Sequence, residues 1–479
     1  MPEVADVELD PRRWPALLIC CSALFMTLLD VSVTNVALPS IGLATGAAPS
    51  QLQWVVSGYT LAFGLVPVLS GRLGDDHGRR LMFQVGIASF AATSMLAGIA
   101  PTAGVLIAAR VLQGLAGGLI NPQVSGLVQQ MFRGQERGRA FGVLGTTVGV
   151  GTAMGPLVGG ALIALGGPQN GWRLVFFVNV PIGVAVILLA RRLLPADQVH
   201  GRHRLDVLGA ALLGGALFCV LFAAVEYDAV HDWRLAWLGV PAAVLLALFI
   251  RRERRLTRLR QDPLIDLHLF RVPSYSAGVL FALLYFPAMA GLPLVLALYY
   301  QRGLGYTALE SGLGVTAYAL GSAVAAPLAG RVVTRIGRPL VVAATVSFGV
   351  GAASLAVLVS HAPASGVALA LAPALFVMGA ASGAIITPNQ TLTLMEVDPV
   401  TGSTAGGVLQ TGQRIGLAVG QAVIGAVFFA HLRTVGTVAA RYDDALRAAI
   451  GAALGFVILA AVVGVWDLVR TRRRLRTAA

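Results

Sequence analysis

The sequence predicts an all-α integral membrane protein with about fourteen transmembrane helices. Hydrophobic residues make up 57% of its 479 residues and charged residues only 12%, which is about half the charged share of a typical soluble domain. Apolar segments close to the roughly 20 residues that a helix needs to cross a bilayer recur from one end of the chain to the other. The composition therefore excludes an ordinary soluble enzyme.

The expected helices follow one another with mostly short polar connections. The first comes after a short polar N-terminus, is longer than the apolar core of a signal peptide and has no clean cleavage site after it, so we expect it to be retained. In chain order the expected spans are 15–38, 51–71, 81–100, 104–128, 138–165, 173–194, 206–227, 235–250, 274–298, 307–329, 339–360, 365–387, 401–430 and 447–469.

The connections between these helices are alternately rich and poor in arginine. All 35 basic residues are arginine, against 22 acids, for a formal net charge of +13. The positive-inside rule places the arginine-rich connections, and with them both termini, in the cytoplasm. Two connections deviate, because the outer loop near Arg441 and Arg447 is basic and the inner loop near Glu396 and Asp398 is acidic.

The arginine pattern also excludes two other classes of function. The arginines lie in short runs between apolar segments, which argues against a nucleic acid partner. Because the chain has no lysine, it lacks a phosphate-binding loop of the GxxxxGK[ST] type and carries no ATPase of that kind.

The longest polar stretch, 251–274, divides the chain into two halves. It predicts a short surface helix followed by a proline-bounded linker. A weak internal repeat supports the division, because GRLGDDHGRR at 71–80 and GRVVTRIGR at 330–338 share their glycine and arginine spacing, and paired repeats are a common plan of transporters. The expected domains are an N-terminal six-helix bundle (1–194), two inserted transmembrane helices (195–250), a cytoplasmic amphipathic linker (251–273) and a C-terminal six-helix bundle (274–479).

The fifth expected helix is unusually rich in glycine. Its segment 141–160, FGVLGTTVGVGTAMGPLVGG, would be a poor helix in water, since each glycine costs roughly 1 kcal/mol relative to alanine and the interior proline about 3. In a bilayer, Gly151, Gly155 and Gly159 form one smooth face on which another helix can pack closely. We expect this face to meet the other bundle.

Six motifs in the expected order resemble the major facilitator superfamily, specifically its fourteen-helix branch of drug:proton antiporters. They are LDVSVTNVALP at 29–39, the loop at 71–80, LIAARVLQGLAGG at 106–118, GTAMGPLVGG at 151–160, WRLVFFVNVPIG at 172–183 and LDVLGA at 205–210. The resemblance covers essentially the whole chain and implies the major-facilitator fold. It also implies an antiporter motif made by Gly151, Gly155, Pro156, Gly159 and Gly160.

Asp30 is the only charge in the first expected helix. A carboxylate at that depth costs several kcal/mol unless it is protonated or paired. At 1.5 Å per residue, Asp30 and Arg110 lie about 12 and about 9 Å from the outer ends of their helices, so their depths match. We hypothesise that Asp30 alternates between an ion pair with Arg110 and a protonated state, which couples the protein to protons. The alternative is a permanent pair that only fixes helix packing.

The connection 71–80 predicts a conformational latch made by Gly71, Asp75, Gly78, Arg79 and Arg80. Asp75 can sit at the N-terminus of a helix of the other bundle, where the helix dipole favours an anion by about 0.3–1 kcal/mol. Breaking and remaking that contact would bias the inward and outward states, whereas the alternative is a solvated turn. The chain departs from the superfamily pattern at Asp76, where a basic residue is usual.

Polar and aromatic residues of the expected helices are candidates for a substrate cavity, although many such residues make helix-to-helix hydrogen bonds instead. They are Asn35, Gln53, Trp54, Tyr59, Gln113, Asn179, Tyr299, Tyr300, Asn389, Gln413 and Arg414. No deep acid of the C-terminal bundle neutralises Arg414, which leaves a substrate anion, water or backbone carbonyls as its partners. The seven histidines lie in or near loops and the three cysteines have no CxxC spacing, so no metal or catalytic site is expected.

These features predict a secondary transporter and not an enzyme. The leading hypothesis is a proton-coupled antiporter that exports hydrophobic or cationic small molecules across a bacterial inner membrane by alternating access. We expect a monomer embedded in the bilayer that needs no cofactor, because the proton gradient drives it. Two alternatives stay open: a specific exporter of one metabolite, such as an antibiotic or lipid, and an uptake symporter. The scarcity of buried acids slightly favours the specific exporter.

Overall fold

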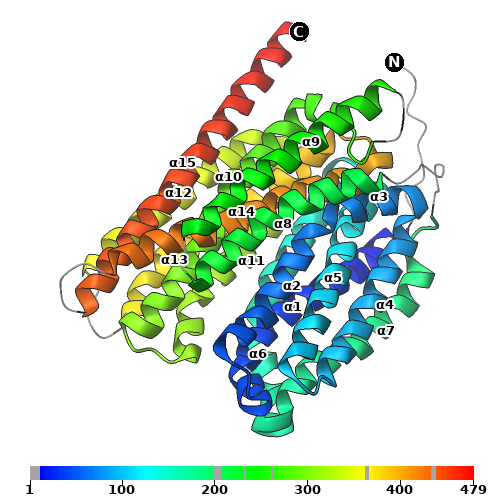
Figure 1. Ribbon diagram of the computed structural model, residues 1–479. Coiled ribbons are helices and arrows are strands. Elements are labelled where there is room, and N and C mark those ends of the chain that lie inside the picture. Colours follow the sequence, from blue (N-terminus) through cyan, green and yellow to red (C-terminus); the bar gives the residue numbers. More distant parts are fainter. Residues whose placement is uncertain are drawn as a thin grey trace.

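Helices account for nearly all of the described chain (Figure 1). The computed structural model describes residues 11–197, 206–230, 233–259, 261, 263–361, 366–432 and 438–478. Within these residues there is no β-strand, so the all-α prediction is confirmed.

Three groups of helices follow one another along the chain. The N-terminal bundle comprises α1 (Arg13–Thr45), α2 (Pro49–Leu65), α3 (Pro67–His77), α4 (Arg79–Gly98), α5 (Ala103–Met131), α6 (Gly134–Phe177) and α7 (Asn179–Leu193). The middle group comprises α8 (Val207–Val230), η1 (Trp233–Leu238), α9 (Gly239–Arg258) and η2 (Leu267–Arg271). The C-terminal bundle comprises α10 (Pro273–Leu298), η3 (Tyr299–Gly303), α11 (Ala308–Ile336), α12 (Arg338–His361), α13 (Val367–Met395), η4 (Pro399–Thr401), α14 (Gly402–His431) and α15 (Val438–Ala478).

Each of the fourteen expected spans lies on a helix. Among the described residues, ten helices are long and apolar enough to cross a membrane, or eleven if α2 and α3, which meet at a 48° bend before Pro67, form one span. The three remaining expected spans fall on the first part of α6, on α8 and on α9. Gly167, with a φ of 75°, interrupts α6 and separates the fifth expected span from the sixth.

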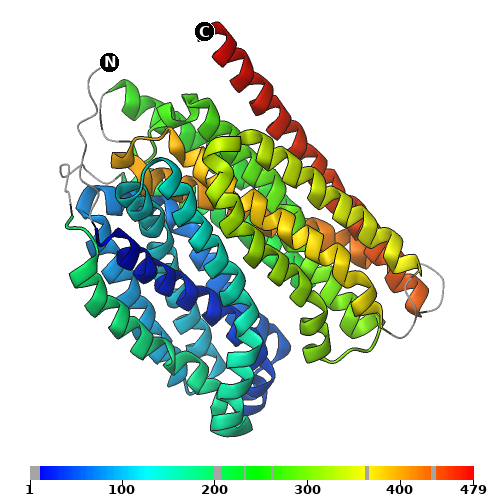
Figure 2. The ribbon, with the colours of Figure 1, turned by 180° about the vertical axis from the view of Figure 1, so that it is seen from behind.

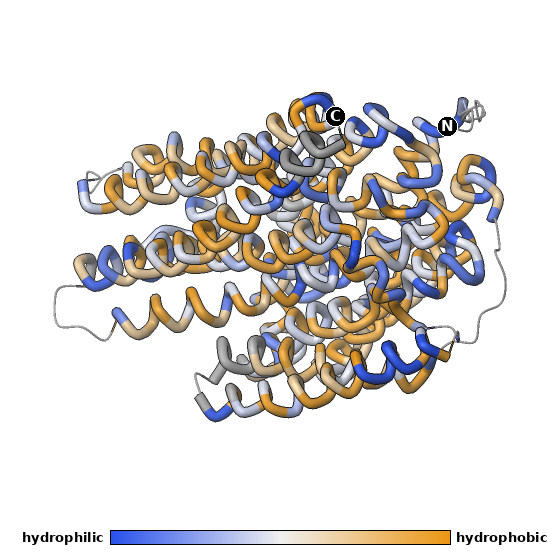
Figure 3. Tube along the Cα trace, turned by 90° about the horizontal axis from the view of Figure 1, so that it is seen from above, coloured by the Kyte–Doolittle hydropathy of each residue, from blue (hydrophilic) through white to orange (hydrophobic). Residues whose placement is uncertain are grey.

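The outer surface of the helices is apolar, as a bilayer requires. Hydrophobic residues cover most of the helix lengths, and hydrophilic residues gather toward helix ends and connections (Figure 3). Leu157, Leu165 and Leu369, for example, are 70%, 80% and 81% exposed. Soluble proteins rarely expose large contiguous apolar patches. The chain is therefore a multi-pass membrane protein.

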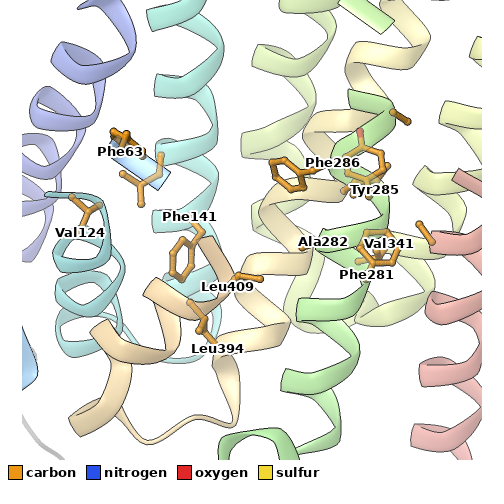
Figure 4. Close-up of a cluster of buried hydrophobic side chains, with 14 of the residues drawn as sticks. Phe63, Val124, Phe141, Phe281, Ala282, Tyr285, Phe286, Val341, Leu394 and Leu409 are labelled. Atoms are coloured by element: carbon orange, nitrogen blue, oxygen red, sulfur yellow. The ribbon is translucent and has the colours of Figure 1, made fainter. Parts of the chain in front are cut away.

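The two bundles lie side by side and share one buried core (Figure 2). Helix α6 packs against α11, and α14 packs against α3 and α5. Phe141 of α6 lies in this core together with Leu394 of α13 and Leu409 of α14 (Figure 4). The middle group joins both sides, because α8 contacts α2 and α14.

The bundles meet at the end of the molecule that carries the connections α3–α4, α5–α6 and α13–α14, which we call the arginine-rich end. Here α6 approaches α11 through glycines: a Cβ on Gly138 would lie 2.5 Å from the carbonyl oxygen of Gly330, and one on Gly142 would lie 3.1 Å from Cα of Pro327. The ribbons of the two bundles separate toward the opposite end (Figures 1 and 2).

The expectation that Gly151, Gly155 and Gly159 face the other bundle is wrong in this structure. A Cβ on any of these three glycines would meet side chains of α1, which belongs to the same bundle. The other bundle meets the preceding part of α6, from Gly138 to Gly149. A spacing of four identifies a smooth helix face but not its partner, and α6 carries two such faces.

The contact at Gly155 makes a prediction about stability. A methyl group at this position would lie 1.9 Å from Oγ of Ser32 and 3.0 Å from its carbonyl carbon, whereas one on Gly160 would meet nothing within 4 Å. We expect Gly155→Ala to lower the free energy of unfolding by about 1–3 kcal/mol, the usual cost of overpacking, and Gly160→Ala to leave it unchanged. Thermal melting of the two purified variants in the same detergent checks this, and equal melting temperatures would contradict it.

Candidate functional site

The centre of the N-terminal bundle holds a fully buried acid, Asp30 of α1. Its Oδ2 accepts a hydrogen bond from Nη1 of Arg110 at 2.5 Å, and the two form an ion pair. Its Oδ1 accepts from Nε2 of Gln113 at 2.9 Å and from Nδ2 of Asn179 at 2.8 Å. Asp30 and Arg110 are each 1% exposed and the two amides 0%. Both oxygens of the carboxylate therefore have partners without water.

Arg110 keeps several contacts besides the acid. Its Nε donates to the carbonyl oxygen of Val55 at 3.1 Å, and its Nη1 also donates to Oε1 of Gln113 at 2.7 Å. The guanidinium carbon lies 4.2 Å from the ring centroid of Tyr59, a distance at which a cation is attracted to an aromatic face. A guanidinium held at this many points stays in place when one partner is lost.

A second cation, Arg414 of α14, is half-buried and faces the same part of the N-terminal bundle from the other side. Its guanidinium carbon lies 4.2 Å from the ring centroid of Phe63, and that ring is 5.8 Å from the ring of Tyr59. Within the described residues, Arg414 makes no hydrogen bond or ion pair with any side chain or backbone group. The cation is thus held by an aromatic ring alone and has unused donors.

The structure separates the remaining residues that were expected to line one cavity. Gln113 and Asn179 bind Asp30. Trp54 lies 6.0 Å from Phe222 of α8 between ring centroids. Asn35 is exposed, and Gln53 and Gln413 are partly exposed.

Three more of these residues lie in the C-terminal bundle, away from Asp30. The hydroxyl of Tyr299 donates to Asp443 at 2.9 Å, and the ring of Tyr300 stacks on Tyr306 at 5.5 Å. Asn389 accepts a hydrogen bond from Arg338 at 2.8 Å, so it joins the last turns of α13 to the start of α12.

At the arginine-rich end, Asp75 of α3 lies at the N-terminus of α14. Its Oδ2 accepts hydrogen bonds from the backbone N–H and the hydroxyl of Thr404, both at 2.8 Å, and its Oδ1 accepts from the N–H of Ser403 at 3.2 Å. Backbone donors and the helix dipole both favour an anion at this position. The contact joins the N-terminal bundle to the C-terminal bundle.

Gly71 and Arg79 complete this contact, which we call the latch. A Cβ on Gly71 would lie 2.4 Å from the carbonyl oxygen of Ser403, so only glycine lets α3 approach α14 this closely. Arg79 donates to Oδ1 of Asp75 at 2.8 Å, to the carbonyl oxygen of Gly126 at 2.9 Å and to that of Val400 at 3.1 Å. The guanidinium therefore bridges the acid to both bundles.

Gly78 and Arg80 do not cross to the other bundle. Gly78 has a φ of 108°, a conformation that favours glycine, and a Cβ there would collide with the side chain of Asp197. The N–H of Arg80 donates to Oδ1 of Asp197 at 2.8 Å, and its guanidinium donates to the carbonyl oxygen of Arg191. These two residues tie the start of α4 to the end of α7.

Other residues at these sites act through their place in the fold and could not be singled out from the sequence. Ser94 of α4 accepts a hydrogen bond from Nδ2 of Asn179 at 3.0 Å and donates to the carbonyl oxygen of Phe176 at 2.8 Å. Ser403 and Thr404 supply the donors for Asp75. The only signal for the latter pair was the polar run GSTAGG that starts the thirteenth expected span.

Comparisons with known proteins agree with this architecture. A family model described as the Major Facilitator Superfamily matches residues 20–314 and 278–479. Among solved structures, the human organic anion transporter has a TM-score of 0.68 at 16% identity and covers 95% of this chain and 100% of its own. A proton:xylose symporter has a TM-score of 0.65 at 13% identity, with 94% of each chain covered. At these identities the likeness shows the fold.

Sequence relatives are more similar. A probable actinorhodin transporter of Streptomyces coelicolor is 38% identical over 437 residues, which cover 90% of this chain and 75% of that protein. A puromycin resistance protein of Streptomyces alboniger is 35% identical over 483 residues, covering 97% and 92%. A tetracenomycin C resistance and export protein of Streptomyces glaucescens is 33% identical over 431 residues, covering 88% and 77%. The chain belongs to the Major Facilitator Superfamily, in its drug-efflux branch.

Proposed function

We propose that the protein exports small molecules in exchange for protons, with Asp30 as the proton-binding group. The observation that carries this proposal is the burial of Asp30 among Arg110, Gln113 and Asn179 at the centre of the N-terminal bundle. Buried acids inside membrane spans are costly and are typical of proton pathways. The names of two sequence relatives, a tetracenomycin C resistance and export protein and a puromycin resistance protein, support the direction of transport.

Two states of Asp30 are compatible with its surroundings. In one the carboxylate is ionised and paired with Arg110, and in the other it is protonated. Protonation removes the ion pair, but Val55, Gln113 and Tyr59 still hold the guanidinium. The pair can then form again without a large rearrangement of Arg110, which a reversible cycle requires.

A chain of contacts links Asp30 to the other bundle. Arg110 lies over Tyr59, Tyr59 lies beside Phe63, and Arg414 of α14 lies over Phe63. Because these groups are close together, a change in the charge of Asp30 alters the electrostatic potential at Tyr59 and Arg414. Energetic coupling between sites needs such a physical route together with an element that has two arrangements. In this proposal the latch, closed here and open in the other state, is that element.

The driving force is sufficient without a cofactor. One proton that crosses about 100 mV supplies roughly 2.3 kcal/mol, and a pH gradient adds to it. In this proposal the protein acts as a monomer in a bacterial inner membrane, with the arginine-rich end and both termini in the cytoplasm. The latch then closes the cytoplasmic side, and the separated ends of the bundles face outward.

Arg414 favours the specific exporter over a pump for cations. In the described part of the chain, Arg414 is a deep cation with no acid beside it, and Asp30 already has three donors. The surroundings of Arg414 therefore repel a cationic substrate and attract a neutral or anionic one. We propose an aromatic metabolite of the antibiotic class as the substrate, a class to which the names of the relatives also point.

If Asp30 couples export to protons, replacing it should abolish proton-driven export without abolishing exchange of substrate. In proteoliposomes, Asp30→Asn should reduce export driven by an imposed pH gradient to the level of empty liposomes, because the amide cannot release a proton. Exchange of substrate without a gradient should persist. The control is Asp467→Asn, which breaks another buried ion pair, with Arg338, and should leave coupling intact. Normal proton-driven export by Asp30→Asn would refute the assignment.

The latch predicts a change in access from the cytoplasm. Ser125 is 2% exposed and lies under the latch, so a Ser125→Cys reporter, with Cys20, Cys21 and Cys219 replaced by alanine, should react slowly with a maleimide. Adding Asp75→Asn should speed the reaction about fivefold, the factor for a loss of about 1 kcal/mol.

The matched control for the latch is Asp76→Asn. Asp76 is the next residue, is also buried and pairs with Arg72 of its own helix at 3.0 Å. This variant should leave the labelling rate unchanged. Equal rates for both variants would mean that Asp75 does not hold the bundles together.

Growth of cells in the presence of toxic compounds of different charge tests which charge the substrate carries. Cells that express the protein should resist neutral and anionic aromatic compounds and gain little protection against lipophilic cations. Arg414→Gln should lower resistance to the anionic compounds at least several-fold and leave that to neutral ones largely intact. Broad protection against cations that Arg414→Gln does not alter would favour a multidrug pump instead.

A further inference from the structure

A large cavity lies between the middle group of helices and the C-terminal bundle, away from Asp30. Its volume is about 1060 Å³, and α8, α9, η2, α10 and α14 supply most of its lining. Sites for drug-sized molecules usually measure about 300–1,000 Å³. Nothing in the proposed transport cycle uses this cavity.

The cavity is a groove that follows one face of α9. The lining residues of this helix recur every three or four positions, from Gly239 through Ala243 and Leu246 to Ile250 and Arg254. Helix α9 packs on α8, η1 and η2, while its groove face looks toward α10 and α14. From Gly239 to Ile250 the apolar part is about 17 Å long at 1.5 Å per residue. That length is close to one leaflet of a bilayer core about 30 Å thick.

Apolar side chains form the opposite wall. They come from Leu213 and Leu217 of α8, Leu283 of α10 and Ile415 of α14. A site for a soluble anion would not need this depth of apolar wall, and a purely hydrophobic molecule would not need a charged mouth.

The mouth of the groove is basic. Arg254 and Arg258, one turn apart at the end of α9, line it together with Arg271 of η2. All three are exposed and have no hydrogen bond or ion pair within the described residues. His268 also lines the mouth, and its Nδ1 lies 2.8 Å from Oδ1 of Asp266.

The acids near the mouth that the structure describes already have partners. Asp206 pairs with Arg252 at 2.8 Å, and Oε2 of Glu253 accepts a hydrogen bond from the N–H of Ile265 at 3.1 Å. The three arginines at the mouth are therefore available to an anion from outside the chain.

We propose that the groove binds one anionic phospholipid of the cytoplasmic leaflet. Its phosphate lies against Arg254, Arg258 and Arg271, and an acyl chain runs along α9 into the apolar part. Basic residues at the cytoplasmic end of a membrane helix attract anionic lipids, and the depth of the groove fits a chain that enters from one leaflet. The proposal goes beyond the transport function and takes from it only the orientation in the membrane.

A lipid in this groove contacts the helix that carries the latch. Val408, Gly412 and Ile415 of α14 line the groove, one to three turns beyond Thr404, which binds Asp75. The bound lipid thus fills the space between α9 and the C-terminal bundle, and it contacts both the inserted helices and α14.

Native mass spectrometry of the full chain in mild detergent tests the proposal. Delipidated protein is titrated with phosphatidylglycerol or with phosphatidylcholine of the same acyl chains. We expect one tightly retained phosphatidylglycerol per protein and at least tenfold weaker retention of phosphatidylcholine. Glycerol phosphate, which has the charge without the chains, should not displace the lipid at equal concentration. Equal retention of the two lipids, or displacement by glycerol phosphate, would overturn the proposal.

Matched double variants test the basic mouth. Arg254→Gln with Arg258→Gln should weaken retention of phosphatidylglycerol about thirtyfold, which corresponds to about 2 kcal/mol. Arg251→Gln with Arg255→Gln removes the same charge from the same turns of α9. These two arginines are also exposed and line an adjoining hollow on α9, but they do not line the groove itself, so this control should retain the lipid. Similar losses in both double variants would indicate only a general attraction to a basic surface.

A third comparison tests the acyl-chain part of the groove. Ala243→Trp fills it and leaves the arginines in place, whereas Val244, the next residue of α9, is exposed and does not line the groove. Ala243→Trp should abolish retention and Val244→Trp should not. Unchanged retention in Ala243→Trp would place the lipid elsewhere. Because retention is measured without transport, failure of Asp30→Asn to uncouple export would leave this result unaffected.

Discussion

The lack of water in the bilayer core is the constraint on which the rest of the structure depends. A charge placed there must find its partners within the protein. Asp30 meets this condition with donors from Arg110 and Gln113 of α5 and from Asn179 of α7. One side chain of α1 thus fixes how three helices pack. In the proposed cycle, protonation of Asp30 removes the charge that attracts Arg110.

Close contact through glycine is the second physical theme. Gly138 and Gly142 bring α6 against α11, and Gly71 brings α3 against α14. These contacts bury backbone against backbone and leave little side chain to unpack when the surfaces part. They therefore suit an interface that opens and closes. Gly155 and Gly159, by contrast, pack α6 on α1 within one bundle, where a close contact makes the bundle rigid.

Helix α14 connects the parts of the molecule to which we assign functions. Its N-terminus holds Asp75, its middle carries Arg414 over Phe63, and its outer face lines the groove beside α9. A rigid helix transmits a displacement at one of these places to the others. The proposed proton site, the latch and the proposed lipid site are therefore connected through α14, although Asp30 belongs to the other bundle.

The sequence by itself determined the membrane class, the fourteen helical segments and the residues that carry charge at depth. Hydropathy and charge are local properties that the bilayer selects segment by segment, so Asp30, Arg110 and Asp75 could be singled out without a structure. The packing partners of these residues and helices could not be identified from the sequence. The spacing of Gly151, Gly155 and Gly159, for example, is equally compatible with packing on α1 and on the other bundle. Only the tertiary structure placed Asn179 at Asp30 and Ser94 at Asn179, paired Tyr299 with Asp443 and Asn389 with Arg338, and formed the groove beside α9. Each of these depends on how helices far apart in the sequence pack.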